Sequence, residues 1–175
     1  MIYKDFSVKS WLAIIFEFLA APVLITGGIF SLIFSQRLNI ETKDWMLEQA
    51  MIEQNTFDFF QIQESFKSDS LMILGIGIAG MILLAAGCIT IGIFLLKKNK
   101  IVVLVHKALG ALTGAISFLI FVLLLVTNLM DPSVGDEGIA MVITSGVFSA
   151  CIITSTVLTF VSKDFESAKI FKIKK

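Results

Sequence analysis

Residues 71–96 read LMILGIGIAGMILLAAGCITIGIFLL, a run of 26 residues that contains no charged side chain. A helix needs about 20 mainly apolar residues to cross the roughly 30 Å of hydrocarbon in a bilayer. Three lysines, Lys97, Lys98 and Lys100, follow the run at once, and basic residues commonly flank a membrane span. This stretch therefore predicts a transmembrane helix.

Three more apolar runs of similar length complete a set of four. The expected spans are residues 11–34, 71–96, 104–130 and 139–161. The bilayer core has no water to satisfy backbone groups, so each span is expected to be helical. Mean hydropathy is +0.92 and 57% of the residues are hydrophobic, against about 45–50% in soluble domains. The sequence predicts an all-α membrane protein, a four-transmembrane-helix bundle forming a single domain over residues 1–175.

The distribution of lysine predicts the orientation. Lysines gather before the first span, between the second and third spans, and in the tail at residues 162–175. Residues 35–70 carry three basic and seven acidic residues, and residues 131–138 carry three acidic residues and no basic one. Basic segments stay on the cytoplasmic side. We therefore expect a multi-pass protein of the cell membrane with both termini cytoplasmic and a tail suited to the lipid surface.

The long segment between the first two spans, residues 35–70, has a helical pattern of its own. Apolar residues recur every seventh position, at Leu38, Trp45, Ile52, Phe59 and Phe66. This period predicts one or two amphipathic helices in an outer loop. Two interpretations stay open: the helices lie on the bilayer or cap the bundle, or Trp45, Ile52, Phe59 and Phe66 form a docking face for another protein.

Glu17 is the most informative single residue, because it lies inside the first span. An ionisable side chain at such depth costs roughly 2.5–3.5 kcal/mol on insertion scales, so it usually faces the bundle interior or water. His106 and Lys107 are expected at a similar depth in the third span. We therefore expect Glu17 to pair with His106 or Lys107. The alternatives are a solvated Glu17 near the interface and a role in an ion or proton pathway.

Small residues within the spans indicate close helix packing. The set comprises Gly27, Gly80, Gly87, Gly110 and Gly114, of which the last two form a GxxxG pair. Glycines at this spacing let two helix backbones approach closely. The contacts lie either within this bundle or between this chain and another membrane protein.

Residue patterns typical of enzymes are absent from the sequence. The chain has one histidine, and its two cysteines, Cys88 and Cys151, both lie in apolar runs. Neither a histidine-based metal cluster nor a phosphate-binding glycine-rich loop can be recognised. We expect no enzyme activity, no cofactor and no metal, and the lysines are explained by topology rather than by nucleic acid.

The stretch GIFLLKKNK at residues 92–100, leading into a glycine-bearing third span, resembles small, uncharacterised four-helix membrane proteins of Gram-positive bacteria. That resemblance implies the tetraspan fold and no particular activity. The order of loops also resembles the claudin layout. The claudin loop motif is missing, because Trp45 stands alone and residues 35–70 contain no cysteine, so barrier function is not implied.

These observations favour a non-enzymatic accessory, assembly or immunity-type subunit. Such a subunit would act through helix contacts and the outer loop, with another membrane protein or a second copy of the chain as partner. The alternative is a small transporter or channel that uses Glu17. An intramembrane enzyme ranks third.

Overall fold

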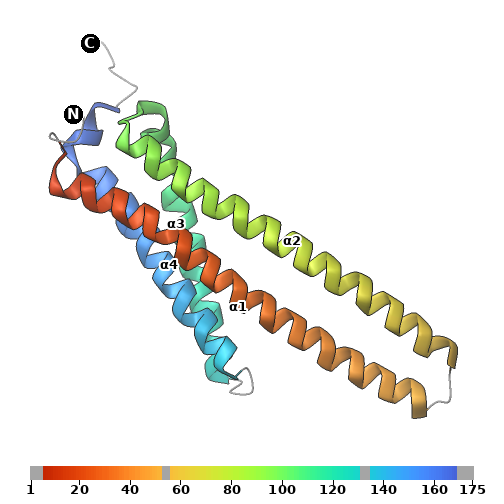
Figure 1. Cartoon of the computed structure of the whole chain (residues 1–175). Helices are drawn as coiled ribbons and strands as arrows, with labels where there is room; N and C mark the ends of the chain where they lie inside the picture. Colours follow the sequence, from red (N-terminus) through yellow and green to blue (C-terminus); the bar gives the residue numbers. More distant parts are fainter. Residues whose placement is uncertain (1–5, 53–55, 131–134, 169–175) are drawn as a thin grey trace.

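The computed structural model of the chain describes residues 6–52, 56–130 and 135–168, with the side chains of residues 6–52, 61–130 and 135–165. Within these ranges the structure is helical and contains no strand (Figure 1). It comprises α1 (Val8–Ile52), α2 (Thr56–Leu96), α3 (Lys100–Met130), α4 (Gly135–Val161) and the short 3₁₀ helix η2 (Lys163–Ala168).

All four long helices are long and apolar enough to cross a membrane. The predicted all-α architecture with four membrane-length apolar helices is therefore confirmed, and it suits a multi-pass membrane protein. The start of α1, the end of α4, the α2–α3 turn and η2 lie at the same end of the molecule, here called the termini end.

The segment expected as an outer loop, residues 35–70, is not a separate element. Residues 35–52 continue α1, and residues 56–70 form the first part of α2. No glycine or proline stands between residues 34 and 56 to stop the first helix, and helices usually end at such residues. The result is a helical hairpin, residues 35–52 and 56–70, that extends beyond α3 and α4 (Figure 1) instead of covering them. We call it the projecting hairpin.

The α2–α3 turn follows from the sequence KKNK. Lys98 adopts a left-handed conformation with φ of 49°, and the Asn99 backbone N–H donates to the Phe94 carbonyl at 3.1 Å. This bond is the signature of a Schellman helix end. The Asn99 side chain then accepts hydrogen bonds from the backbone N–H groups of Ile101 and Val102 at 3.1 and 3.2 Å. Asn99 therefore closes α2 and caps α3.

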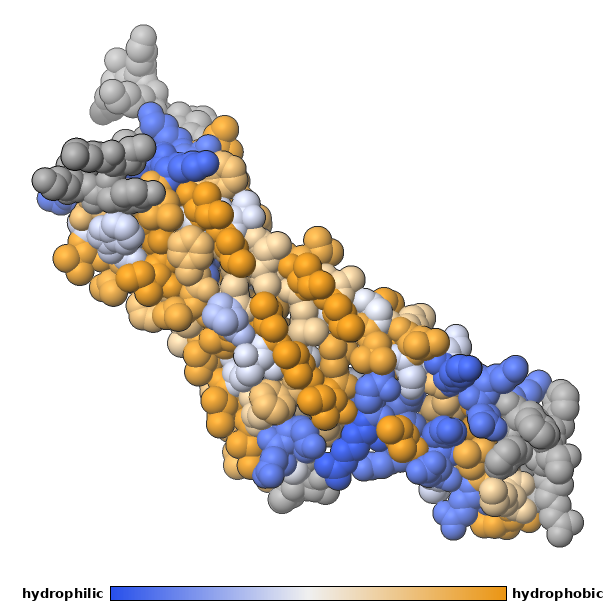
Figure 2. Space-filling model, in the orientation of Figure 1, coloured by the Kyte–Doolittle hydropathy of each residue, from blue (hydrophilic) through white to orange (hydrophobic). Residues whose placement is uncertain are grey.

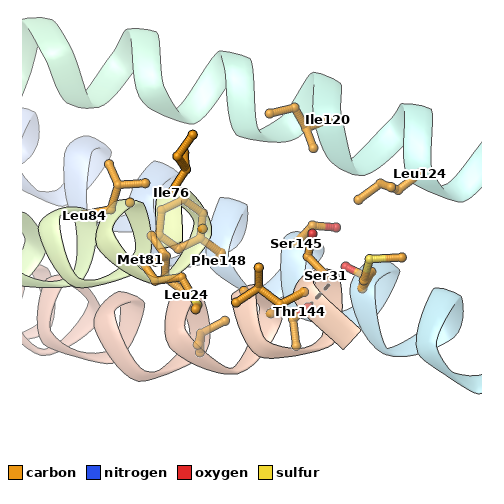
Figure 3. Close-up of a pocket in the computed structure, with 17 residues that line it drawn as sticks. Leu24, Ser31, Ile76, Met81, Leu84, Ile120, Leu124, Thr144, Ser145 and Phe148 are labelled. Atoms are coloured by element: carbon orange, nitrogen blue, oxygen red, sulfur yellow. Dashed lines mark hydrogen bonds between the residues drawn. The ribbon is translucent and has the colours of Figure 1, made fainter. Parts of the chain in front are cut away.

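The helices pack in a row rather than in a closed square. α1 lies between α2 and α4, and α4 packs on α3, whereas α2 and α3 touch only slightly. The opening between α2 and α3 contains a pocket of about 540 Å³. Figure 3 shows Ile76 and Met81 of α2 lining it with Ile120 of α3. Most of the residues that line the pocket are apolar. The Thr144 hydroxyl, one of the few polar groups among them, donates a hydrogen bond to the Ala140 carbonyl of its own helix.

The buried apolar residues form two clusters along the bundle. The terminal cluster, near the termini end, comprises Ala13, Ile14, Leu95, Val103 and Phe165. The middle cluster lies deeper and comprises Ala20, Ala21, Ala85, Cys88, Cys151 and Ile152.

The five glycines expected at helix contacts divide into two groups. Three of them stand where an added Cβ would meet α4: Gly27, Gly110 and Gly114. At Gly110 the nearest atom would be the hydroxyl of Thr156. The other two, Gly80 and Gly87, have no heavy atom within 4 Å of such a Cβ. They therefore bring no pair of helices of this chain together.

Replacing Gly110 with leucine is expected to separate α3 from α4 and to lower the free energy of unfolding by about 1–3 kcal/mol, the usual cost of overpacking. Gly87→Leu is the matched control, since its Cβ meets open space. Denaturant titration of the detergent-solubilised protein measures both. Equal stability of the two variants would contradict the close α3–α4 approach.

Candidate functional site

The candidate site is built around Glu17, on the buried face of α1. Ser10, Ile14, Glu17 and Ala21 follow one another at spacings of three or four residues and are all buried, which places them on one side of the helix. The Glu17 side chain is 1% exposed. A carboxyl group this deep among apolar residues needs a partner, because an isolated charge there is costly.

His106 of α3 faces the carboxyl group. Its Nε2 atom lies 3.6 Å from Glu17 Oε2 and 3.2 Å from the Ser155 hydroxyl of α4. The His106 side chain is 2% exposed. Among the residues that the structure describes, Glu17 Oε2 is one of four buried side-chain atoms without a hydrogen-bond partner. His106 Nε2 thus lies between Glu17 of α1 and Ser155 of α4. Its distance to the Glu17 oxygen is slightly longer than a hydrogen bond.

Apolar residues enclose this polar group on both sides. The terminal cluster lies toward the chain ends and the middle cluster lies deeper in the bundle. Cys88 of α2 and Cys151 of α4 are buried in the middle cluster with Ala20 and Ala21, which follow Glu17 by one helical turn. Thr156 of α4 stands beside His106 and Gly110 of α3. The site therefore collects a side chain of every long helix around one carboxyl group.

Lys107, the other partner expected for Glu17, points elsewhere. Its Nζ atom donates to the Phe165 carbonyl of η2 at 3.2 Å and lies 5.5 Å from the centre of the Phe160 ring. Successive residues of a helix point about 100° apart, since one turn takes 3.6 residues. His106 and Lys107 therefore cannot both face α1, and His106 is the one that does.

A second polar cluster, at the termini end, joins the start of α1 to the end of α4. The carboxylate of Asp164 accepts hydrogen bonds from the Ser7 backbone N–H at 2.8 Å and from the Ser10 hydroxyl at 2.5 Å. The Ser10 hydroxyl also lies 2.5 Å from that of Ser162. We call these four residues the terminal clasp. The hydrogen bond from Ser10, followed by that from Ser7, lowers the pKa of Asp164 to about 2.

The terminal clasp was not predicted from the sequence. Its members are common polar residues at the two ends of the chain, separated by more than 150 positions. The available signal was Ser7, a typical N-cap residue directly before α1, whose hydroxyl accepts a hydrogen bond from the Ser10 backbone N–H at 3.4 Å. The partners of these two serines at the other end of the chain cannot be read from that signal.

The residues expected to dock a partner lie on the projecting hairpin. Leu38, Trp45 and Ile52 are 46%, 60% and 69% exposed, so this stripe faces away from the α2 arm. Phe66 is half-buried. Phe59 lies in α2, and its side chain is outside the described part of the structure.

Polar contacts hold the two arms of the projecting hairpin together near its base. The Asn39 amide donates to the Ser70 hydroxyl at 2.5 Å, and the Gln36 amide donates to the Ser70 carbonyl at 3.2 Å. Arg37 pairs with Glu41 at 2.9 Å and with Glu137 of α4 at 3.4 Å. Through Glu137, the base of the projecting hairpin is thus joined to the N-terminal end of α4. Figure 2 shows polar residues around the hairpin and near the termini end, with apolar surface between them.

The described residues contain no group of three or more His, Cys, Asp or Glu side chains placed to hold a metal ion. No protein-family model, curated protein or solved structure matches the chain.

The terminal clasp predicts a response to acid. Because the pKa of Asp164 is lowered from 3.8 to about 2, the clasp stabilises the fold above pH 3.8 and loses this contribution as the pH falls through 2. Trp11, whose ring centre is 5.7 Å from that of Phe6, is the reporter in a Trp45→Phe background. Its fluorescence should stay constant from pH 7 to 4 and change as the pH falls toward 2, where the folded-state carboxylate is protonated.

Asp164→Asn is the control for this titration. The variant lacks the carboxylate, so the change attributed to the clasp should be absent. The same acid transition in the variant would contradict the assignment.

Proposed function

We propose that the protein is a non-enzymatic subunit of a membrane complex, of the accessory, assembly or immunity type. It acts in the cell membrane through the projecting hairpin, with both termini cytoplasmic. The observation that carries this proposal is the hairpin itself, which extends beyond α3 and α4 and exposes Trp45 and Ile52.

Charge supports the proposed orientation. The termini end carries Lys97, Lys98 and Lys100 in the α2–α3 turn and Lys163 at the start of η2. Residues 35–70, which include the hairpin, carry seven acidic residues against three basic ones. Basic segments are retained on the cytoplasmic side, so the hairpin projects from the outer face.

The chemistry of the hairpin favours a protein partner over the lipid surface. Anionic lipid headgroups attract basic segments and repel acidic ones. Trp45 sits on an exposed apolar stripe among acidic residues, and buried tryptophans dominate many protein interfaces. The expected partner is the outer part of another membrane protein, with an apolar groove bordered by basic residues.

Transport through the bundle is less well supported. A pathway needs polar groups or water along its whole length. On the buried face of α1, Glu17 is followed by Ala20 and Ala21, which pack in the apolar middle cluster.

The proposal is tested by purifying a tagged chain from native membranes in mild detergent. A partner should co-purify at fixed stoichiometry, and Trp45→Ala combined with Ile52→Ala should remove it, because these side chains are more than half exposed. Truncating such an anchor typically costs 2 kcal/mol or more of binding, about 30-fold in affinity.

Met51→Ala is the matched control, since Met51 is 64% exposed on the same helical arm and, as the neighbour of Ile52, points about 100° away from the stripe. Co-purification that survives the Trp45 and Ile52 changes, or a chain that purifies alone, would sink the proposal.

A further inference from the structure

A column of buried hydroxyl groups runs along α4 from the termini end to Glu17. It comprises Ser155, Thr159 and Ser162, at spacings of four and three residues, and each is at most 1% exposed. Residues at these spacings share a helix face, with Cβ atoms about 5–6 Å apart. Neighbouring hydroxyls in the column can therefore be bridged by one water molecule or by rotation of a side chain.

Both ends of the column meet titratable groups. At the termini end Ser162 contacts Ser10, which donates to the Asp164 carboxylate. At the inner end Ser155 lies 3.2 Å from His106 Nε2, which faces Glu17. The Thr159 hydroxyl donates to the Ser155 carbonyl at 2.8 Å, and its lone pairs remain able to accept.

Among the residues that the structure describes, the column does not continue past Glu17. The next buried residues are Ala20 and Ala21 on α1 and Ile152 and Cys151 on α4, all in the middle cluster. Ser149 is buried further along α4 with an unpartnered hydroxyl. By position on α4, the layer formed by Ile152 and Cys151 lies between Ser149 and Ser155.

We propose that Glu17 and His106 form a buried binding site for one proton, and that the proton reaches the site only from the termini end. The route runs from Asp164 through Ser10 and Ser162, then through Thr159 and Ser155. This property is independent of the partner proposed for the hairpin.

The site binds a single proton because it consists of two bases, a carboxylate and an imidazole, that face each other and share that proton. A carboxylate and a neutral imidazole carry one negative charge between them, and adding a proton makes the pair neutral. The proton allows one group to donate to the other, which closes the 3.6 Å gap and gives Glu17 Oε2 the partner that it lacks. In an apolar interior the neutral pair is strongly preferred over an isolated charge.

Other titratable groups near the site do not supply this proton. Cys88 of α2 and Cys151 of α4 are thiols of the middle cluster. Lys107 of α3 reaches the Phe165 carbonyl. Asp164 stands at the mouth of the column with Lys98 near it, where it exchanges protons with solvent.

The single histidine of the chain makes the test direct. In protein labelled with ¹⁵N-histidine and held in lipid nanodiscs, the ring nitrogen signals belong to His106 alone. Glu17→Gln should change these signals at neutral pH, because the proton-sharing partner is lost. Ser145→Ala should leave them unchanged, since Ser145 bonds to its own helix outside the column.

The route is tested by the rate at which the His106 ring proton exchanges with D₂O. Thr159→Val, which removes one hydroxyl at nearly constant volume, should slow exchange about tenfold, equivalent to about 1.4 kcal/mol in the barrier. Thr159→Ser should restore the rate, which separates loss of the hydroxyl from loss of packing. Unchanged exchange in Thr159→Val, or ring signals unaffected by Glu17→Gln, would overturn the proposal.

One-sided access is tested in liposomes that contain a pH-sensitive dye. A dead-end site predicts no proton flux above that of protein-free liposomes. A flux that Glu17→Gln abolishes would show a route across the membrane and would overturn the one-sided site.

Discussion

The contact of His106 with Glu17 and Ser155 is the interaction on which the arrangement of the helices depends. In a bilayer, apolar side chains gain little by leaving lipid for protein, so helix association relies on close packing and on polar contacts. Here one imidazole joins α1, α3 and α4 at a single level. Gly110 allows the approach, because Thr156 occupies the space where a side chain would be.

The two ends of the bundle differ because polar ties are unevenly placed. At the termini end, the terminal clasp and the terminal cluster hold α1, α4 and η2 together. Toward the other end, α2 packs on α1 alone and leaves the apolar pocket beside α3. The projecting hairpin continues this less enclosed half. The ordered, titratable part of the molecule and its proposed docking surface are therefore at opposite ends.

The fold was largely predictable from the sequence, because apolar runs and the need for backbone hydrogen bonds in lipid leave few alternatives. The sequence pattern predicted that residues 35–70 are helical, but it did not predict that they continue α1 and begin α2. Periodicity identifies a helix but does not show whether that helix joins its neighbour. Glu17 was found from its depth, whereas the choice between His106 and Lys107 depended on the rotation of α3. The link between Ser10 and Asp164 joins the chain ends, and no local pattern encodes it.

The measurement that tests this account most directly is a double-mutant cycle on Glu17 and His106, by denaturant unfolding in mixed micelles. His106→Leu leaves a buried carboxyl without its partner and should cost about 3–5 kcal/mol, whereas the double change to leucine should recover much of that loss. Their coupling energy should therefore reach about 2–3 kcal/mol, the upper part of the usual range for residues in contact, while Glu17→Leu and Ser145→Ala should be additive. Additive effects of the Glu17 and His106 changes would contradict the central contact.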